Sequence, residues 1–366
     1  MNTTRNISMR TMSLDIIRGF SLFGMLIVHA AGFSGASNFL IHSLDYYLAV
    51  FNHLFFESKF VSIYSFLFGV GSHMFFSRTT QRGLHSYQLF SRRLITLLPI
   101  GIISILIVPQ VTPILVMYSL LGFILVPFFK LQPKMILRIV VILASCNMTL
   151  MIGTMVYINL LAKSTISTQL TMAIAAFTHF IYYIFLIVSM CLLGLYVGKI
   201  NPFQQASQQL SIVKRIHKIS FSLSLPLIVG GLWVGFLNPN ISENVSFLGI
   251  GDLASYPLSI FYVTSILILY NKNYFMYTYK PLSYVGRISL TAYVGHLILL
   301  KLFILLLGWT HGFTLVQSLV LVCIVFTILI IFSFVWMQKF QQGPLEKAWR
   351  FFTYGKYAPI KKPSSY

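Results

Sequence analysis

Long blocks of apolar residues, separated by short polar stretches, run through the whole chain. Leu, Ile, Phe and Val fill these blocks without the sustained alternation that transmembrane β-strands would show. A helix needs about 20 apolar residues to cross a bilayer's hydrocarbon core, and lipid cannot satisfy free backbone groups. The pattern therefore predicts an all-α, polytopic bundle of about ten membrane-spanning helices.

The predicted spans lie near residues 16–35, 60–77, 94–108, 111–129, 135–160, 173–197, 217–237, 253–270, 285–307 and 312–336. A tight hairpin is expected at 109–113. The stretch 44–56 is apolar and aromatic but carries Asp45, Asn52 and His53, and we interpret it as an interfacial helix. No clear sign of internal repeats or of broken helices is found in the sequence.

Composition agrees with a membrane protein, because 57% of the 366 residues are hydrophobic and only 9% are charged. A soluble domain carries about 25% charged residues. The simplest partition is one membrane domain, 1–338, followed by a basic tail, 339–366. The first apolar run is long enough to span and holds Asp15 and Arg18, so we expect a retained helix rather than a cleaved signal peptide.

The net charge of +20 follows the predicted topology rather than marking a nucleic-acid-binding protein. On that topology, 23 of the 26 Lys and Arg residues fall on one side. The other side holds only Lys59, Lys163 and Lys301, the last inside a span. Cytoplasmic loops are enriched in Lys and Arg, so the asymmetry predicts a plasma-membrane protein with both termini in the cytoplasm. Some of these charges would contact anionic lipid headgroups.

The three cysteines, Cys146, Cys191 and Cys323, all fall within predicted spans. Their odd number and unpaired spacing indicate neither a disulfide framework nor a metal site.

Ionisable groups inside a membrane are costly, and the first span carries three of them. Asp15 and Arg18 are three residues apart and can pair across one helical turn, either as an anchor or as part of a site. His29 follows Arg18 by eleven residues, close to three turns, so the two share a face. At ~1.5 Å per residue, His29 would lie ~16 Å further along the axis, past mid-membrane. A structural histidine that bonds a neighbouring helix is the alternative.

Glu57 and Lys59 are expected at the outer mouth of the second span, toward which His29 points. Glu57 could orient or charge-balance a nearby imidazole, or it could be a solvated interface residue.

Two further clusters carry cations, and the second of them repeats the combination of arginine and histidine. Arg92 and Arg93 open the third span ahead of Pro99, either as positive-inside anchors or as a forked anion site for a phosphorylated donor. Arg287 lies near the cytoplasmic start of the ninth span and His296 about midway along it.

At these clusters the chain resembles the YeiB-like bacterial membrane proteins, known as domain of unknown function 418. The landmarks are Leu14-Asp15-Ile16-Ile17-Arg18-Gly19-Phe20, Glu57-Ser58-Lys59-Phe60, Ser65-Phe66-Leu67-Phe68-Gly69, Gly286-Arg287, Leu290-Thr291, Tyr293, Gly343-Pro344-Leu345-Glu346, Trp349 and Thr353-Tyr354-Gly355. That family looks distantly similar to the acyltransferase-3 proteins and the lysosomal heparan glucosaminide acetyltransferases.

The chain departs from its nearer relatives at two positions. YeiB-like proteins usually carry Asn where this chain has His29 and Gln where it has His296. Acyltransferase-3 proteins carry an arginine, ten residues and then a histidine, which Arg18 and His29 match. Their Gly-x-Ile-Ser…Tyr-x-x-His pattern is matched by residues 286–296, and their Arg-Arg…Pro element by residues 92–99.

The resemblance and the residues together favour an acyltransferase that moves an acyl group from a cytoplasmic thioester donor to an acceptor at the outer face. His29 would act as general base or acyl carrier, with Glu57 and His296 orienting or assisting. The donor's phosphates would be held by Arg18, Arg92 and Arg93, with Asp15 and Arg287 at the same site.

On this hypothesis no cofactor is permanently bound. An acyl-CoA-type donor would be a substrate, and the acceptor would be an extracytoplasmic glycan or lipid. The rival function is a transporter or an export accessory protein whose buried polar groups line a substrate path. A structural membrane partner without chemistry of its own is the third alternative.

Overall fold

The computed structural model describes residues 2–35, 43–109, 114–161, 168–200, 206–237, 245–272 and 274–355. These residues form helices and turns, with no strand among them, so the all-α prediction is confirmed. The helices are α1 (Asn2–Ser34), α2 (Leu44–Phe55), α3 (Lys59–Gln81), α4 (Ser86–Ile107), α5 (Ile114–Leu121), α6 (Pro133–Leu161), α7 (Thr168–Ile200), α8 (Ala206–Leu237), α9 (Val245–Leu253), α10 (Ser255–Asn271), α11 (Met276–Arg287), α12 (Ser289–Leu306), α13 (Leu315–Lys339) and α14 (Pro344–Tyr354). Short 3₁₀ turns lie at Gly122–Leu125, Pro127–Phe129 and Trp309–His311.

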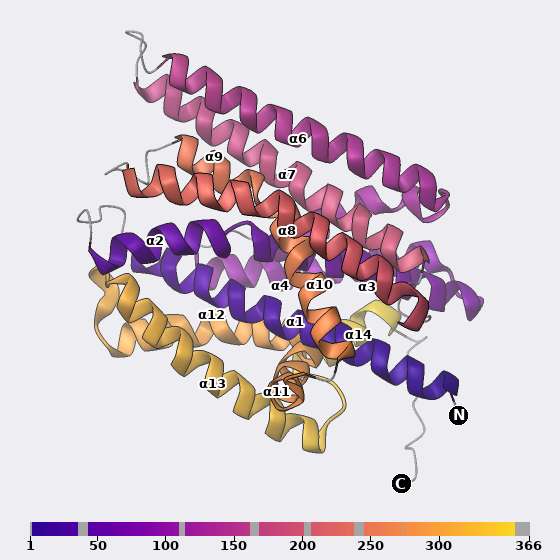
Figure 1. The fold of residues 1–366 in the computed structure, drawn as a ribbon. Helices are drawn as coiled ribbons and strands as arrows, with labels where there is room; N and C mark the ends of the chain where they lie inside the picture. The colour runs from indigo at the N-terminus through magenta and orange to yellow at the C-terminus, as the bar shows by residue number, and fades with distance from the viewer. Residues whose placement is uncertain are drawn as a thin grey trace.

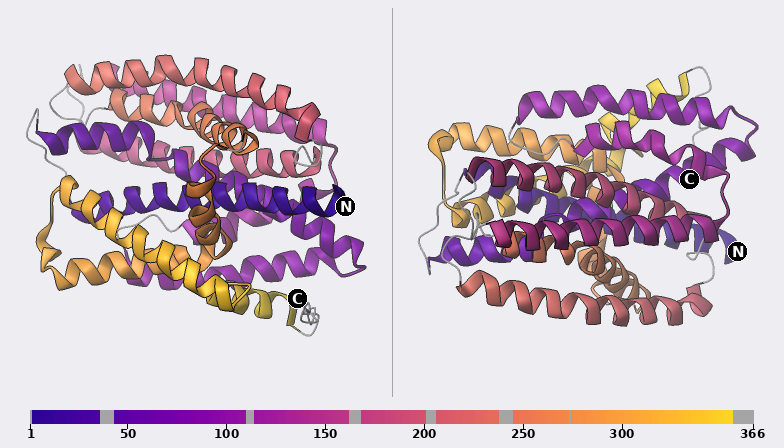
Figure 2. Two further views of the ribbon diagram at one scale, coloured as in Figure 1. Left: turned by 60° about the horizontal axis from the view of Figure 1, so that its bottom comes forward. Right: turned by 90° about the horizontal axis from the view of Figure 1, so that it is seen from above.

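The long helices lie side by side in one bundle, whereas α10 and α11 cross their common direction (Figures 1 and 2). Within the described residues, eight segments are long and apolar enough to cross a membrane. They are Met12–Ser34, Leu44–Gln81, Ser86–Ile107, Pro133–Leu160, Ala173–Ile200, Leu210–Phe236, Ser289–Leu306 and Leu315–Lys339. The other two expected spans correspond to the shorter apolar stretch Ile114–Leu125 and to the 17-residue α10. The number ten therefore stays a prediction.

Two helical segments are each broken in two in the half of the bundle that lies away from the arginines. The sequence did not predict these breaks. α2 ends at Phe55 and α3 begins at Lys59, with Ser58 between them at a φ of 62°. α9 gives way to α10 at Ala254. The stretch 44–56 does form a helix, α2, but it lies along the bundle and leads directly into α3, so that Leu44–Gln81 is one candidate membrane span rather than an interfacial helix followed by a span (Figure 1).

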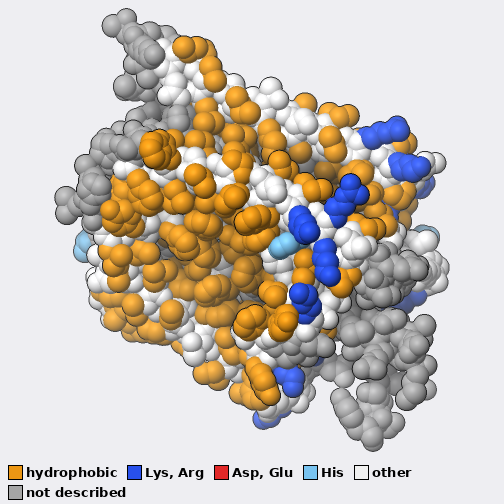
Figure 3. All heavy atoms as spheres, viewed as in Figure 1, with side chains coloured by type: hydrophobic (Ala, Val, Ile, Leu, Met, Phe, Trp, Pro, Cys, Tyr) orange, Lys and Arg blue, Asp and Glu red, His pale blue; other side chains and the backbone are white. Residues whose placement is uncertain are grey.

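Lys and Arg side chains gather toward one end of an otherwise apolar face (Figure 3). This end, where α1 begins, α3 ends and α4 begins, is called the basic end below, and the other is the opposite end (Figure 1). Most of the hairpin expected at 109–113 lies outside the described residues, as do Lys163 and the tail beyond residue 355.

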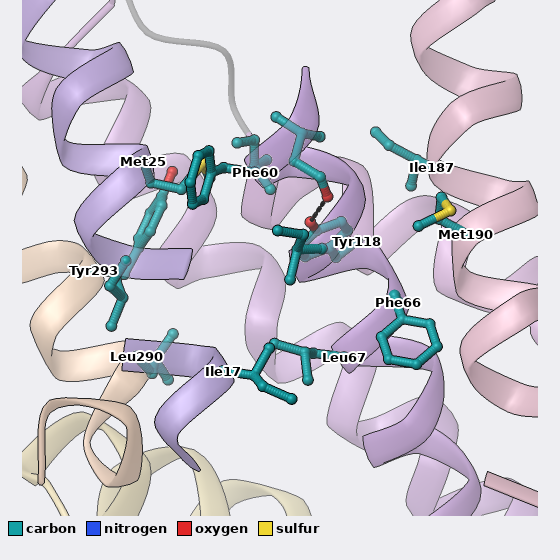
Figure 4. Packing of buried hydrophobic residues seen from close by; sticks show 14 of the residues in the cluster. Ile17, Met25, Phe60, Phe66, Leu67, Tyr118, Ile187, Met190, Leu290 and Tyr293 are labelled. Carbon is teal, nitrogen blue, oxygen red and sulfur yellow. Dashed lines mark hydrogen bonds between the residues drawn. The ribbon is translucent and has the colours of Figure 1, made fainter. Parts of the chain in front are cut away.

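The core packs mainly α1, α3, α7 and α12, with Ile17 and Met25 of α1 among its fully buried side chains (Figure 4). Glycines bring α3 and α7 into backbone contact. A Cβ on Gly69 would collide with the Cys191 carbonyl, and one on Gly194 would collide with the Phe66 carbonyl. Small residues at such crossings are what membrane helices use to pack closely.

Candidate functional site

Two adjoining cavities enter the bundle from the basic end. The outer cavity has a volume of about 420 Å³ and the inner one about 230 Å³. Both are lined by Arg18, Gly71, Arg93, Arg287, Glu346 and Trp349, so the two form one continuous recess.

The outer cavity is strongly cationic. Six arginines line it: Arg18, Arg78, Arg82, Arg93, Arg287 and Arg350. Only two carboxylates, Asp15 and Glu346, are among its lining residues. Asp15 accepts a hydrogen bond from Arg18 at 3.0 Å, as the sequence predicted, and lies 3.7 Å from Arg287 Nε. The excess of guanidinium groups suits a ligand with several negative charges.

Arg93 is held at the junction of the two cavities by aromatic rings. Its guanidinium carbon lies 4.4 Å from the Trp349 ring centroid and 4.8 Å from that of Phe75. Trp349 Nε1 also donates to the Arg93 carbonyl at 3.0 Å. Buried Arg93 Nε has no hydrogen-bond partner among the described residues, which leaves a donor for a ligand.

Helix α14 forms one wall of both cavities because Glu346 anchors it to the start of α12. The carboxylate accepts hydrogen bonds from Leu290 N at 2.6 Å, Thr291 N at 3.2 Å and Thr291 Oγ1 at 2.5 Å. Ile288 at the N-cap position has no side-chain acceptor, so Glu346 satisfies amides that the first turn of α12 leaves open. Burial raises the pKa of the Glu346 carboxyl above its ordinary value, and the hydrogen bonds from Thr291 and Leu290 oppose that shift.

The inner cavity is lined by apolar side chains and three tyrosines, Tyr64, Tyr118 and Tyr293. Tyr118 donates to the Val61 carbonyl at 3.2 Å (Figure 4). The buried Tyr64 hydroxyl has no partner in the part of the chain that the structure describes. A second unpaired polar group in the same recess again indicates a binding site rather than packing alone.

Beyond the inner cavity, His29 of α1 meets His296 of α12. His29 Nδ1 and His296 Nε2 are 2.7 Å apart, and the two side chains are almost completely buried. His296 Nδ1 lies 3.2 Å from the Ala292 carbonyl oxygen, which can only accept. With neutral rings, His296 Nε2 then accepts from His29 Nδ1, and the lone pair of His29 Nε2 remains available as a base.

Tyr293 connects the cavities to the histidine pair. Its ring lines the inner cavity and lies edge-on to both imidazoles, with centroids 5.9 Å from His29 and 5.2 Å from His296. Met25 also lines the inner cavity, one helical turn before His29. The recess therefore leads from the arginines to the edge of the histidine pair.

Four of the five residues expected to bind a donor line the outer cavity, namely Asp15, Arg18, Arg93 and Arg287. Arg92 does not. It is exposed and donates to the Phe352 carbonyl of α14 at 3.2 Å, an anchoring contact.

Glu57 also lies elsewhere. It does pair with an imidazole, but that of His53, at 2.7 Å. Lys59, expected at the outer mouth of the second span, is fully buried.

Several residues that line the recess were not predicted from the sequence. Arg78 lies in the last turn of α3 and Arg82 caps its C-terminus, four residues later, a spacing that was available but was counted only as positive charge. Glu346 and Trp349 stood among the family landmarks without an assigned role. Tyr64 gave no signal, because a tyrosine inside an apolar run is usually core.

Comparisons with known proteins support the YeiB-like resemblance. Residues 197–356 match the family "Protein of unknown function (DUF418)". An uncharacterized 39.9 kDa protein in the amylase 3′ region of Bacillus acidopullulyticus is 29% identical over 364 residues, and the alignment covers 95% of each chain. Uncharacterized protein YxaH of Bacillus subtilis strain 168 is 27% identical over 401 residues, again covering 95% of each chain. No solved structure matches the chain significantly.

Proposed function

We propose that the protein is a membrane-embedded acyltransferase. It would take an acyl group from a phosphorylated thioester donor of the acyl-CoA type at the basic end. The acceptor would be a glycan or lipid hydroxyl that approaches from the opposite end.

One observation carries this proposal: an arginine-lined recess leads inward to Tyr293, which contacts the His29–His296 pair. Arginines bind phosphate in a forked geometry, and the excess of six arginines over two carboxylates suits a donor with several phosphates. The inner cavity, with its apolar lining and tyrosine hydroxyls, suits the thioester end of such a molecule.

In the proposed reaction, the acceptor oxygen attacks the thioester carbonyl while His29 Nε2 takes the hydroxyl proton. An oxygen–carbon bond forms and the carbon–sulfur bond breaks. The proton ends on the departing sulfur, so that an ester and a thiol leave and both imidazoles return to their starting state. His296 positions His29 by accepting from its Nδ1.

The excess of Lys and Arg supports a location of the basic end in the cytoplasm, the compartment that would supply the thioester. On this orientation both termini are cytoplasmic and the protein resides in the plasma membrane. His29 then lies toward the outer half, where the acceptor is.

A binding measurement tests the donor site. Coenzyme A, the thiol that would be released, should raise the melting temperature of the detergent-solubilised protein. Pantetheine, which lacks the phosphates, should not. Equal responses to the two compounds, or none to coenzyme A, would argue against a phosphate-binding recess.

Transport is a second candidate, because interrupted helices that meet at buried polar groups are typical of transporters. α2–α3 and α9–α10 are interrupted in this way, and Ser58 bonds to Asp252 between them. Proteoliposomes loaded with a donor labelled separately in its acyl and nucleotide parts distinguish the two functions. A transferase moves the acyl label alone, whereas a transporter moves both.

A further inference from the structure

Tyr64 places a buried hydroxyl group in the lining of the inner cavity, and this hydroxyl has no hydrogen-bond partner among the described residues. The hydroxyl of Tyr118, in the same lining, differs because it already donates its single proton to the Val61 carbonyl at 3.2 Å. A buried hydroxyl without a partner is energetically unfavourable, and one that lines a cavity can be satisfied by a bound molecule. Tyr64 therefore offers a hydrogen-bond donor to a ligand in the recess.

Helical geometry places Tyr64 deeper in the bundle than the arginines. Gly71 lies beside Arg18, because a Cβ on Gly71 would be 3.8 Å from a guanidinium nitrogen of Arg18. Tyr64 precedes Gly71 by seven residues, almost two turns, and so shares its face of α3 about 10 Å further along the axis. Since α3 ends at the basic end, this displacement leads inward (Figure 1). The Tyr64 hydroxyl also interacts electrostatically with both Arg18 and Tyr293, so it lies near the arginines and near the residue that contacts the histidine pair.

The histidine pair supplies a base but no donor for a reacting carbonyl group. With neutral rings, His29 Nδ1 donates to His296 Nε2, and His296 Nδ1 donates to the Ala292 carbonyl. Both N–H groups are thus used, and His29 Nε2 carries only a lone pair. Attack on a thioester moves negative charge onto its carbonyl oxygen, and a donor fixed in a site without water stabilises that charge. The proposed reaction therefore needs a donor from another side chain.

We propose that the Tyr64 hydroxyl donates a hydrogen bond to the carbonyl oxygen of the acyl donor. This assignment rests on the proposed acyl transfer and divides its chemistry between two helices. His29 of α1 takes the proton of the acceptor hydroxyl, while Tyr64 of α3 stabilises the negative charge that develops on the carbonyl oxygen. The hydrogen bond is strongest in the tetrahedral state and weakens again when the carbon–sulfur bond breaks and the carbonyl group re-forms.

Infrared spectroscopy of the full-length protein tests this assignment without turnover. The probe is a ketone analogue of acetyl-coenzyme A, in which a methylene group replaces the sulfur and the carbonyl carbon is ¹³C, so that no acyl group can leave. A hydrogen bond lowers the stretching frequency of a carbonyl group. The band of the bound analogue should therefore lie at a higher frequency in Tyr64→Phe than in the wild type.

Tyr256→Phe is the matched control for the loss of a tyrosine hydroxyl. The Tyr256 hydroxyl accepts a hydrogen bond from Asn147 Nδ2 at 3.0 Å, and Tyr256 is not among the lining residues of either cavity. This variant should leave the carbonyl band unchanged. Without ligand, it should melt earlier than the wild type because it loses a buried hydrogen bond, whereas Tyr64→Phe removes an unpaired hydroxyl and should keep the melting temperature.

Kinetics give a further readout that a purely structural role would not produce. Removal of one donor to a developing oxyanion lowers kcat by about 10²–10³-fold, and we expect this loss in Tyr64→Phe. Coenzyme A has no acyl carbonyl group, so its binding to Tyr64→Phe should equal that of the wild type.

The possible outcomes separate this inference from the proposed function. A carbonyl band or a kcat that Tyr64→Phe does not change, or a band that only Tyr293→Phe shifts, would overturn the role of Tyr64 and leave acyl transfer standing. A wild-type protein that shows the Tyr64-dependent band but transfers no acyl group would refute the acyltransferase and retain Tyr64 as a donor to a bound carbonyl group. Failure of the analogue to bind would overturn this inference together with the donor site.

Discussion

His29 and His296, which are 267 residues apart in the chain, share one hydrogen bond of 2.7 Å across the contact between α1 and α12. The Ala292 carbonyl lies 3.2 Å from His296 Nδ1 and so fixes which nitrogen of each neutral ring carries the proton. His29 is therefore the member of the pair with a basic nitrogen to offer, and His296 is the member that orients it.

This relationship predicts different outcomes for two substitutions of His29. His29→Asn keeps a donor for His296 Nε2 and should retain the melting temperature, but an amide cannot act as a base, so acyl transfer should be lost. His29→Ala leaves His296 Nε2 buried without a partner, at a cost of about 1–3 kcal/mol, and should melt earlier. Thermal unfolding in detergent and an acyl-transfer assay give the two readouts.

A double variant supplies the matched control. His29→Asn combined with His296→Gln installs the pair that YeiB-like proteins usually carry, and it should be stable and inactive. Full activity in His29→Asn would show that the imidazole is structural.

Substitution of the adjacent residues Arg92 and Arg93 should have different effects on the binding of coenzyme A. Arg93→Lys retains the charge but loses the planar group held between Phe75 and Trp349, together with its unpaired Nε. One charge-assisted hydrogen bond contributes about 1.5–3 kcal/mol, so coenzyme A should bind at least about tenfold more weakly. Arg92 lies outside the recess, so the Arg92→Lys variant should bind coenzyme A normally. Equal weakening by the two substitutions would contradict this assignment.

Arg92 and Arg93 also show how much of the candidate site could be predicted from the sequence. Both were visible as cations at the start of a helix, but successive helical residues point about 100° apart, so only one can face the recess. Which one does depends on the neighbours that α4 finds in the bundle. The local pair of Asp15 and Arg18, by contrast, was predictable from spacing alone and is confirmed.

Local sequence patterns could not predict which residues that are far apart in the chain contact one another. The apolar blocks placed His29 and His296 each on a span, but their contact depends on how α1 packs against α12. Glu57 was expected to serve His29, whereas its partner is His53, four residues earlier, a local spacing that could have been read from the sequence. The interruption after Phe55 could not, because no Gly or Pro marks it.

The α3–α7 crossing should tolerate no side chain at its glycines. Gly69→Ala and Gly194→Ala each place a methyl group against a carbonyl of the facing helix, and overpacking of this kind costs about 1–3 kcal/mol. Gly153→Ala in α6 meets no atom within 4 Å and is the matched control, which should be neutral or slightly stabilising. Melting temperatures of the three variants in one detergent test this, and equal behaviour of all three would contradict it.

The orientation proposed for the basic end predicts the behaviour of reporter fusions. Fusions after residues 82, 132 and 276 should report the cytoplasm, and a fusion near residue 310 should report the outside. A reporter active in only one compartment, fused at each site in turn, measures this. A cytoplasmic signal at 310 would show that the segments between α11 and α13 do not alternate as proposed.

The anchor of α14 should give the protein a pH-dependent stability. Because burial raises the pKa of Glu346 above its ordinary 4.5, this group contributes most to the free energy of unfolding below pH 4.5. That contribution is lost as the pH rises through the higher pKa of the folded state. Glu346→Gln keeps an acceptor for Leu290 N but does not titrate. The melting temperature of the wild type minus that of Glu346→Gln, measured from about pH 4 upward, should therefore fall as the pH rises. A difference that stays constant or grows with pH would show that the hydrogen bonds from Thr291 and Leu290 outweigh burial in setting the pKa of Glu346.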